Sequence, residues 1–222
     1  MSSGPTPGTG IRVLLVDDDA AIRAGWRTVL DAAAGITVVA EAAHGQEAIE
    51  RAAGIDVVLM DIRMPVLDGL EATRVLTRTR PAVRTIVVTT FESDAAVWSA
   101  MRAGAAGFVL KRSPAAELLE AIRIVHASDS LLFPAALGRI AAQHSRPPAI
   151  AHAAGLTPRE DEVLRRLARG RSNAEIAGDL GVGAETVKTH VGNLLDKLGA
   201  RDRTHAVVLA YELGYMFPGA GA

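Results

Sequence analysis

The chain has 222 residues, of which 49% are hydrophobic and 22% charged, so it can bury a core and has room for two domains of ordinary size. It contains no cysteine, which excludes a disulfide framework, a cysteine-ligated zinc site and a cysteine nucleophile. The net charge of −1 divides into −3 for residues 1–137 and +2 for residues 138–222, an asymmetry that only hints at nucleic-acid binding by the second half.

The first ten residues, MSSGPTPGTG, lack the basic and apolar regions of a signal peptide. We expect residues 1–10 to form a disordered tail. No run of about 18 apolar residues is present, so the sequence predicts no membrane-spanning helix and no membrane partner. A cytoplasmic protein is the expected class.

Residues 11–128 alternate short apolar runs with amphipathic stretches. The apolar runs are rich in Val, Ile and Leu, as is typical of strands that are covered on both faces. They comprise Ile11–Val16, Ile36–Ala40, Val57–Met60, Thr85–Val88 and Gly107–Leu110. The stretches between them predict helices over residues 20–33, 45–53, 68–79, 94–103 and 114–126. This alternation indicates an α/β fold, a doubly wound five-stranded parallel sheet with right-handed crossovers.

Residues 129–154 are rich in Pro and Ala and have the composition of a linker, with a possible short helix near 134–142. Residues 155–217 then predict an all-α domain of four helices, at about 158–169, 173–180, 184–198 and 203–214. Thr157 precedes a proline, and Ser172 precedes the second of these helices, so both are expected N-caps. Gly170 and Gly181 stand where helix-terminating turns are needed. Two short helices followed by a longer one form a helix-turn-helix pattern.

Carboxylates follow two strands of the predicted sheet. Asp17, Asp18 and Asp19 come directly after the first strand, and Asp61 comes directly after the third. With the strand order 2-1-3-4-5, these two strands are neighbours and their carboxyl ends flank the topological switch point. Clustered carboxylates repel one another unless a cation neutralises them, and an all-oxygen ligand set favours Mg²⁺. A single aspartate after a strand usually only caps a helix, but two acidic strand ends that converge indicate a metal site.

Two further strand ends add a hydroxyl and a cation. The fourth strand ends at Thr89, and the fifth is followed by Lys111. Either residue alone would pass for an ordinary strand or surface residue. Beside a metal ion and a nucleophilic carboxylate, however, a hydroxyl and an ammonium are what a phosphoryl group requires.

Five motifs of the first half occur in a characteristic order and spacing. They are VLLVDD at 13–18, MDIRMP at 60–65, Gly69, VTT at 88–90 and GFVLK at 107–111. In this they resemble the receiver domain of bacterial two-component response regulators, which has a flavodoxin-like or CheY-like fold. The resemblance implies that Asp61 accepts a phosphoryl group from a sensor histidine kinase. It also implies that Asp17 and Asp18 hold Mg²⁺, assisted by Asp61 and the backbone carbonyl of Arg63.

The same resemblance implies a switch. Thr89 would move inward to bond the phosphoryl group, Lys111 would pair with it, and Phe108 would follow as the aromatic switch residue. Phe108 could equally be a plain core aromatic.

The chain departs from the receiver pattern in two places. Asp19 is a third consecutive acid, which we expect to point away from the pocket as the N-cap of the next helix. Arg112 and Ser113 stand between Lys111 and Pro114, so a cis peptide at Lys111–Arg112 is not expected, because a non-proline cis bond costs about 2.5–4 kcal/mol.

The second half resembles the LuxR-type helix-turn-helix. The motifs are LTPRE at 156–160, SNAEIA at 172–177, ETVKTHV at 185–191, KLG at 197–199 and RTHA at 203–206. A receiver followed by this module resembles the NarL/FixJ subfamily of response regulators.

The helix at 184–198 has the pattern of a recognition helix. Its apolar side chains repeat at helical spacing and predict a core-facing stripe, comprising Val187, Val191, Leu194, Leu195 and Leu198. The resemblance implies that Lys188, Thr189 and Asn193 lie closest to base edges. Residues better placed for phosphates are Thr186, His190 and Arg171. Gly192 either permits a close backbone approach to DNA or reduces base contact.

Weak binding by a single module is expected, because residues 157–203 hold nine basic and eight acidic side chains. We therefore expect a homodimer on adjacent half-sites of double-stranded operator DNA. The last helix is the candidate contact surface, through Val207, Val208, Ala210 and Tyr211, although some of these residues are expected to pack inward.

The leading hypothesis is a phosphorylation-controlled transcription factor. A first alternative is a regulator that works without phosphorylation, with the receiver as a constitutive dimeriser. A second is a Mg²⁺-dependent aspartyl-phosphate phosphohydrolase, which is disfavoured because Arg63 stands where a general acid is needed and no insertion could form a substrate cap. A small-molecule-sensing regulator conflicts with the first half.

Overall fold

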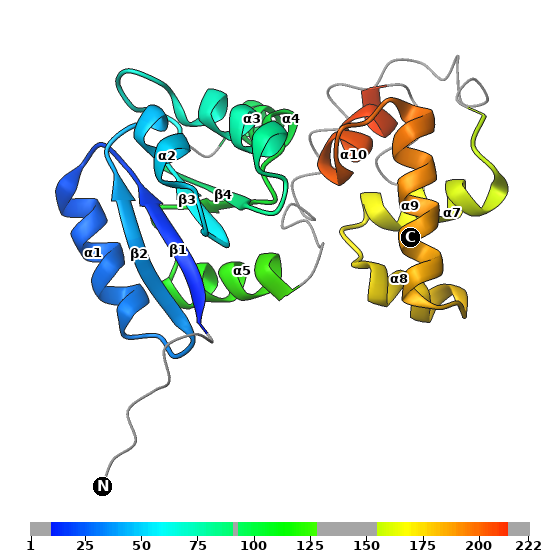
Figure 1. Cartoon of the computed structure of the whole chain (residues 1–222), viewed down its shortest axis with the longest axis horizontal. Coiled ribbons are helices and arrows are strands. Elements are labelled where there is room, and N and C mark those ends of the chain that lie inside the picture. The colour runs from blue at the N-terminus through cyan, green and yellow to red at the C-terminus, as the bar shows by residue number, and fades with distance from the viewer. Residues whose placement is uncertain (1–9, 91–92, 128–154, 213–222) are drawn as a thin grey trace, which may run out of the picture. The chain divides into compact units, whose positions relative to one another are not determined.

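The computed structural model describes residues 10–90, 93–127 and 155–212 (Figure 1). The expected tail up to residue 9, the expected linker with its short helix near 134–142, and the predicted last two residues of the final helix lie outside the described residues. The N-terminal α/β half and the C-terminal helical half are described separately below.

The N-terminal half contains the predicted parallel sheet. Its strands are β1 (Ile11–Val16), β2 (Ile36–Ala42), β3 (Val57–Met60), β4 (Arg84–Thr89) and β5 (Gly107–Leu110). Their order is β2-β1-β3-β4-β5, with parallel pairing of β1 to β2, β1 to β3 and β3 to β4. The predicted fold class is therefore confirmed.

The helices of this half are α1 (Ala20–Asp31), α2 (Gly45–Arg51), α3 (Gly69–Thr79), α4 (Asp94–Ala103) and α5 (Ala115–Ala127). Figure 1 shows α2 and α3 on one face of the sheet and α1 and α5 on the other. The ends of these elements differ from the predicted bounds by at most two residues: α1 and α2 each end two residues earlier than predicted, whereas β2 continues to Ala42 rather than ending at Ala40. The apolar pattern stops at residue 40, but Glu41 and Ala42 still pair with Leu15 and Val16 of β1.

The core between the sheet and helices α2 and α3 is aliphatic. Leu14, Met60, Ala72 and Leu76 are fully buried within it. Every residue of β3 is buried, as expected for a central strand of a parallel sheet that is covered on both faces. This packing holds the carboxyl ends of β1 and β3 side by side.

The C-terminal half contains helices α7 (Pro158–Ala168), α8 (Asn173–Leu180), α9 (Ala184–Leu198) and α10 (Arg203–Glu212). Both predicted N-caps are present, because Thr157 and Ser172 each form a reciprocal capping box with the glutamate three residues later. Gly181 ends α8 in the left-handed conformation, with φ +63°, and so makes the turn into α9. The helix-turn-helix arrangement follows from these local signals.

Across the described part of the chain, no helix combines the length and apolar character that crossing a bilayer requires.

Candidate functional site: an acidic pocket and an exposed helix

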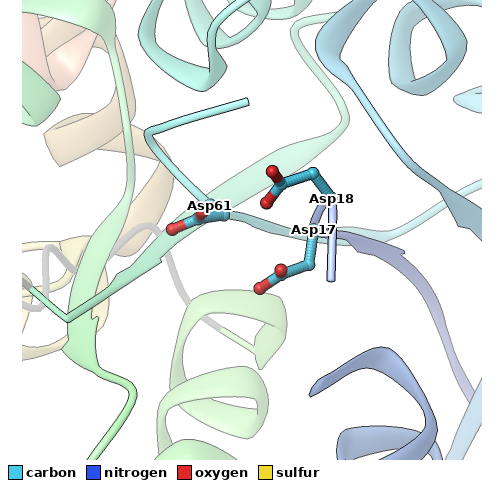
Figure 2. Close-up of side chains that lie close together, drawn as sticks. All are labelled: Asp17, Asp18 and Asp61. Carbon is cyan, nitrogen blue, oxygen red and sulfur yellow. The ribbon is translucent and has the colours of Figure 1, made fainter. Parts of the chain in front are cut away.

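The acidic pocket lies at the carboxyl ends of β1 and β3. These strands pair with Val16 opposite Met60, so the residues that follow them, Asp17 and Asp61, emerge side by side. Figure 2 shows the carboxylates of Asp17, Asp18 and Asp61 gathered together, and one oxygen of each lies within 4.8 Å of the others. Asp17 and Asp61 are buried, whereas Asp18 is exposed. The convergence expected from strand order is thus observed.

Hydrogen bonds to neighbouring strands hold the backbone of this pocket. The amide of Asp61 donates to the carbonyl of Val16 at 2.9 Å, and the amide of Asp17 donates to the carbonyl of Ala42 at 3.2 Å. These bonds extend the pairing of β3, β1 and β2 by one residue beyond the strands. The main chain at the two aspartates is therefore held by the same type of hydrogen bond as the sheet itself.

Asp19 does not join the cluster. Its carboxylate accepts hydrogen bonds from the amides of Ala21 at 2.8 Å and Ile22 at 3.4 Å, which makes it the N-cap of α1. Its own amide donates to Asp17 Oδ1 at 3.0 Å. The expectation that this third acid points away as an N-cap is confirmed.

Lys111 supplies the positive charge of the pocket. Its Nζ lies 2.5 Å from Asp17 Oδ2 and 3.3 Å from Asp61 Oδ2. Burial by itself would lower the pKa of Lys111, but the hydrogen bond to Asp17 and the charges of both aspartates outweigh it, so the pKa is raised. Burial, helped by the charge of Asp17 and opposed by Lys111, raises the pKa of Asp61. In this structure the lysine is the cation that offsets the clustered carboxylates.

The other expected pocket residues take different positions. Thr89 is the last residue of β4, is 1% exposed, and accepts a hydrogen bond on its carbonyl from the amide of Lys111 at 2.8 Å. Phe108 lies within β5 and is half-buried. Arg63 is exposed in the loop between β3 and α3, where it lines an open pocket together with Asp18 and Asp68. Of the residues expected around the carboxylates, Lys111 contacts both Asp17 and Asp61.

Gly69 has a role that sequence reasoning did not identify. It opens α3, and its amide donates to the carbonyl of Ile62 at 2.9 Å. A Cβ at this position would lie 1.8 Å from the carbonyl oxygen of Asp61, far inside contact distance. The first turn of α3 therefore packs directly on the backbone of Asp61. Gly69 is part of the receiver-like motif pattern, but the residues around it in the sequence do not indicate that the start of α3 packs on the backbone of Asp61.

Every peptide bond in the ranges that the structure describes is trans. The link between Lys111 and Arg112 is among them, as expected.

In the helical half, α9 presents a polar face to solvent. Val187 and Leu194 are fully buried, while Val191, Leu195 and Leu198 are half-buried, so the predicted apolar stripe faces the helices α7 and α8 that pack against α9. On the other side Thr186, Lys188, Thr189 and Asn193 are exposed, and His190 is half-buried. This separation leaves one surface of the helix available for a partner.

Several predicted DNA-contact residues already have intramolecular partners. Lys188 lies 3.8 Å from Glu185, and the Thr189 hydroxyl donates to the Glu185 carbonyl at 3.0 Å. Arg171, before α8, pairs with Glu175 at 2.9 Å, and this hydrogen bond raises the pKa of Arg171 further. These ion pairs are exposed and therefore weak, so a phosphate could replace them.

The expected contact surface on α10 is not available. Val207, Val208, Ala210 and Tyr211 are all buried, Tyr211 being the most exposed of them at 6%. Helix α10 packs against α7 and α9, and its apolar residues contribute to the core rather than to the surface. All four side chains pack inward in this structure, where only some of them were expected to, so they do not form the exposed contact surface proposed from the sequence.

Comparison with known sequences places both halves in described families. Residues 13–123 match the response regulator receiver domain, and residues 154–210 match the LuxR family of bacterial regulatory proteins. Over 205 residues the chain is 40% identical to the transcriptional regulatory protein LiaR of Bacillus subtilis, spanning 90% of this chain and 97% of LiaR. It is 36% identical over 204 residues to the response regulator protein VraR of Staphylococcus aureus, spanning 91% and 97% of the two chains.

Solved structures agree with these sequence similarities. The chain is similar to the response regulator ChrA of a heme-sensing two-component system, with a TM-score of 0.52 and 34% identity, covering 94% of this chain and 100% of ChrA. It is also similar to a LuxR-family response regulator from Aurantimonas, with a TM-score of 0.51 and 38% identity over 53% of this chain and 86% of the other.

Proposed function

The chain belongs to the family of two-component response regulators that join a receiver domain to a LuxR-type DNA-binding domain, and from this premise we propose that it is phosphorylated on Asp61. It is a DNA-binding transcriptional regulator, not an enzyme, so the phosphohydrolase alternative is set aside. A response regulator has a cognate histidine kinase and DNA as its partners. We propose that the receiver spans residues 11–128, the linker 129–154 and the DNA-binding domain 155–217.

The proposed reaction is transfer of a phosphoryl group from a histidine of the kinase to the Asp61 carboxylate. A carboxylate oxygen of Asp61 attacks phosphorus, the phosphorus–nitrogen bond breaks, and the electron pair leaves with the imidazole nitrogen. Asp61 suits this role because it is a buried carboxylate at the switch point of the sheet, 3.3 Å from an ammonium group. The clustering of Asp61 with Asp17 and Asp18, beside the Lys111 ammonium, is the observation that carries the proposal.

The donor set of the pocket fits a magnesium ion. Three carboxylates can each direct one oxygen to a common point, and hard oxygen ligands suit Mg²⁺. We assign Asp17, Asp18, Asp61 and the backbone carbonyl of Arg63 as its ligands. When bound, Mg²⁺ would neutralise the negative charge that gathers on the carboxylates and the phosphoryl oxygens.

The switch residues would respond to the new phosphoryl group. We propose that Lys111 exchanges its contacts with the aspartates for a phosphoryl oxygen, and that the Thr89 hydroxyl donates to another. Phe108, in the strand that leads to Lys111, would then change its position. The resulting population shift favours a state that dimerises and binds DNA.

On the DNA side, α9 is the proposed recognition helix. Its exposed residues Lys188, Thr189 and Asn193 would read base edges in the major groove. Phosphate contacts would come from Thr186, His190 and Arg171. The near balance of charge in this half supports a homodimer on two half-sites as the high-affinity form.

The decisive experiment measures intact mass after incubation with an acyl phosphate and Mg²⁺. Wild type should gain one phosphoryl group, and Asp61→Asn should gain none, because the amide cannot act as the nucleophile. Asp19→Asn is the matched control: it removes a neighbouring acid that caps α1, and it should still be phosphorylated.

Phosphorylation of Asp61→Asn would contradict the assignment of the site. If wild type is phosphorylated but neither its oligomeric state nor its operator binding changes, the regulator that works without phosphorylation becomes the better account.

A further inference from the structure

An arginine outside the acidic pocket reaches the backbone of its metal-binding turn. The side chain of Arg23, on α1, is 16% exposed. One terminal nitrogen donates a hydrogen bond to the carbonyl oxygen of Asp17 at 2.5 Å. Its Nε donates to Glu41 Oε2 at 3.2 Å. Arg23 therefore links the turn after β1 to the end of β2.

Glu41 is itself held in place on both oxygens. Its second oxygen, Oε1, accepts from Arg27 Nε at 2.5 Å. Its position in β2 is set by pairing with Leu15 of β1, and the carbonyl of the next residue, Ala42, accepts the amide of Asp17. The strand that anchors the amide of Asp17 thus also supplies the carboxylate that orients Arg23.

The bond from Arg23 constrains Asp18 through the peptide plane. The carbonyl of Asp17 and the amide of Asp18 belong to one planar peptide unit. Fixing the carbonyl oxygen therefore fixes the orientation of the Asp18 amide and restricts where the exposed Asp18 carboxylate can lie. With the Asp17 amide tied to Ala42, the backbone of Asp17 is held at both its nitrogen and its oxygen.

The pairing with Glu41 also offsets the charge of Arg23. Arg23 lines a small pocket together with Asp17 and Asp61, so an unpaired guanidinium would place a positive charge close to the proposed metal ligands. Bound to Glu41, its charge is largely compensated while its hydrogen bond to the main chain is kept.

We propose that Arg23 and Glu41 are positioning residues for the divalent-cation site: Arg23 fixes the Asp17–Asp18 peptide, and Glu41 orients Arg23. This inference rests on the proposed magnesium site. Neither residue contacts the metal or the reacting atoms. Their contribution is to arrange Asp17 and Asp18 before the ion binds, as outer-sphere partners of metal ligands do.

The test is calorimetric titration of the unphosphorylated full chain with Mg²⁺. Arg23→Gln should weaken Mg²⁺ binding about tenfold, the lower end of the effect usual for outer-sphere partners. Arg23→Lys, which keeps a donor for the Asp17 carbonyl, should recover part of the loss. The Mg²⁺ affinity of Glu41→Gln should lie between that of wild type and that of Arg23→Gln.

Arg27→Gln is the matched control. Arg27 binds the same Glu41 carboxylate from the same helix, but the contact to Asp17 belongs to Arg23. Its loss should leave Mg²⁺ affinity near wild type. Thermal unfolding without Mg²⁺ is measured for all variants, because a merely structural role would lower stability for Arg23→Gln and Arg27→Gln alike and leave metal affinity unchanged.

The outcomes separate this inference from the proposed function. If wild type binds Mg²⁺ and Arg23→Gln binds it equally well, the positioning role is overturned and the metal site stands. If wild type binds no Mg²⁺, both are overturned. If Arg23→Gln fails to fold, the Mg²⁺ affinities of Glu41→Gln and Arg23→Lys provide the test. Affinities equal to that of Arg27→Gln would overturn the inference.

Discussion

Lys111 and the two buried aspartates form a charge-compensated group whose balance depends on what else is bound. With the ammonium 2.5 Å from Asp17 and 3.3 Å from Asp61, one positive charge is shared between two carboxylates. A divalent ion that enters the pocket competes with the lysine for the same oxygens. A phosphoryl group on Asp61 would in turn give the lysine a stronger acceptor.

The first prediction concerns this competition. Lys111→Met keeps the length of the side chain but removes its charge, so the three carboxylates should bind Mg²⁺ about tenfold more tightly, a change of about 1.4 kcal/mol. Titration calorimetry measures the affinity. Lys188→Met, which changes a lysine side chain that is 72% exposed on α9, is the control and should bind as wild type does. Unchanged or weaker binding by Lys111→Met would contradict this account of the pocket.

Gly69 shows how a single residue without a side chain can determine the geometry of the site. A Cβ there would collide with the Asp61 carbonyl, at 1.8 Å, and the collision involves backbone that cannot rotate away. We predict that Gly69→Ala lowers the free energy of unfolding by about 1–3 kcal/mol, as overpacking does, and slows phosphorylation because Asp61 must shift.

Gly25, within α1, is the matched control for this prediction. A Cβ built at Gly25 meets nothing within 4 Å. Gly25→Ala should therefore stabilise the protein by about 0.5–1 kcal/mol through helix propensity and leave phosphorylation unchanged. Chemical denaturation and intact mass measure both quantities. A Gly69→Ala variant that is as stable and as reactive as Gly25→Ala would refute the packing argument.

At the level of elements, helix α1 is attached to the edge strand β2 through charge as well as apolar packing. Arg23 and Arg27, one turn apart on α1, both bind Glu41. The hydrogen bond from Arg27, reinforced by Arg23 and opposed by partial burial, lowers the pKa of Glu41. The pairing thus stabilises the folded protein as long as Glu41 is ionised.

The sign of the pH dependence follows from this lowered pKa. The stabilising contribution of Glu41 is complete above its unfolded-state pKa and is lost as the pH falls through the lower folded-state value. We predict that wild type is more stable than Glu41→Gln at pH 7, and that the difference shrinks below about pH 4.3. Thermal unfolding of both proteins between pH 7 and pH 3.5 measures it. Glu50→Gln, which removes an exposed carboxylate from α2, controls for the loss of one surface charge; a difference that persists unchanged at the lowest pH would contradict the prediction.

For the whole molecule, a pocket at one end of a sheet must be coupled to the exposed face of α9. The helical half carries nine basic and eight acidic side chains over residues 157–203, so one copy offers little net attraction to phosphates. Two copies paired on DNA, as proposed, would double the number of phosphate contacts, so dimerisation would be an effective means of control.

We predict that phosphorylation shifts the protein from monomer to dimer and tightens operator binding in parallel. Analytical ultracentrifugation and fluorescence anisotropy with a labelled duplex, with and without an acyl phosphate and Mg²⁺, measure the two effects. Asp61→Asn should show neither effect.

A separate test concerns the role of Lys188. If Lys188 reads bases, Lys188→Ala should weaken binding to the operator more than binding to an unrelated duplex. An equal loss of affinity for both duplexes, with the salt dependence of binding reduced by about one ion, would instead assign Lys188 to a phosphate contact.

The fold and the position of the acidic pocket could be predicted from the sequence because their signals are local. Apolar runs of strand length, separated by amphipathic stretches, determine the α/β class, and parallel connection brings the ends of β1 and β3 together. The N-caps at Asp19, Thr157 and Ser172 are equally local, since a cap needs only a short polar side chain and the amides that follow it.

Other features were decided only by the tertiary structure, because they depend on contacts between residues that belong to different elements. Arg23 and Glu41 are separated by the rest of α1, a turn and most of β2, and neither shows in its own segment that it will support Asp17. The burial of the apolar residues on α10 depends on the helices that pack against it, so the spacing of these residues along α10 could not distinguish a core-facing stripe from a contact surface. Gly69 is required by the backbone of Asp61, eight residues away. Local patterns select elements and their order, whereas side-chain partners across elements are set by packing, which no single segment encodes.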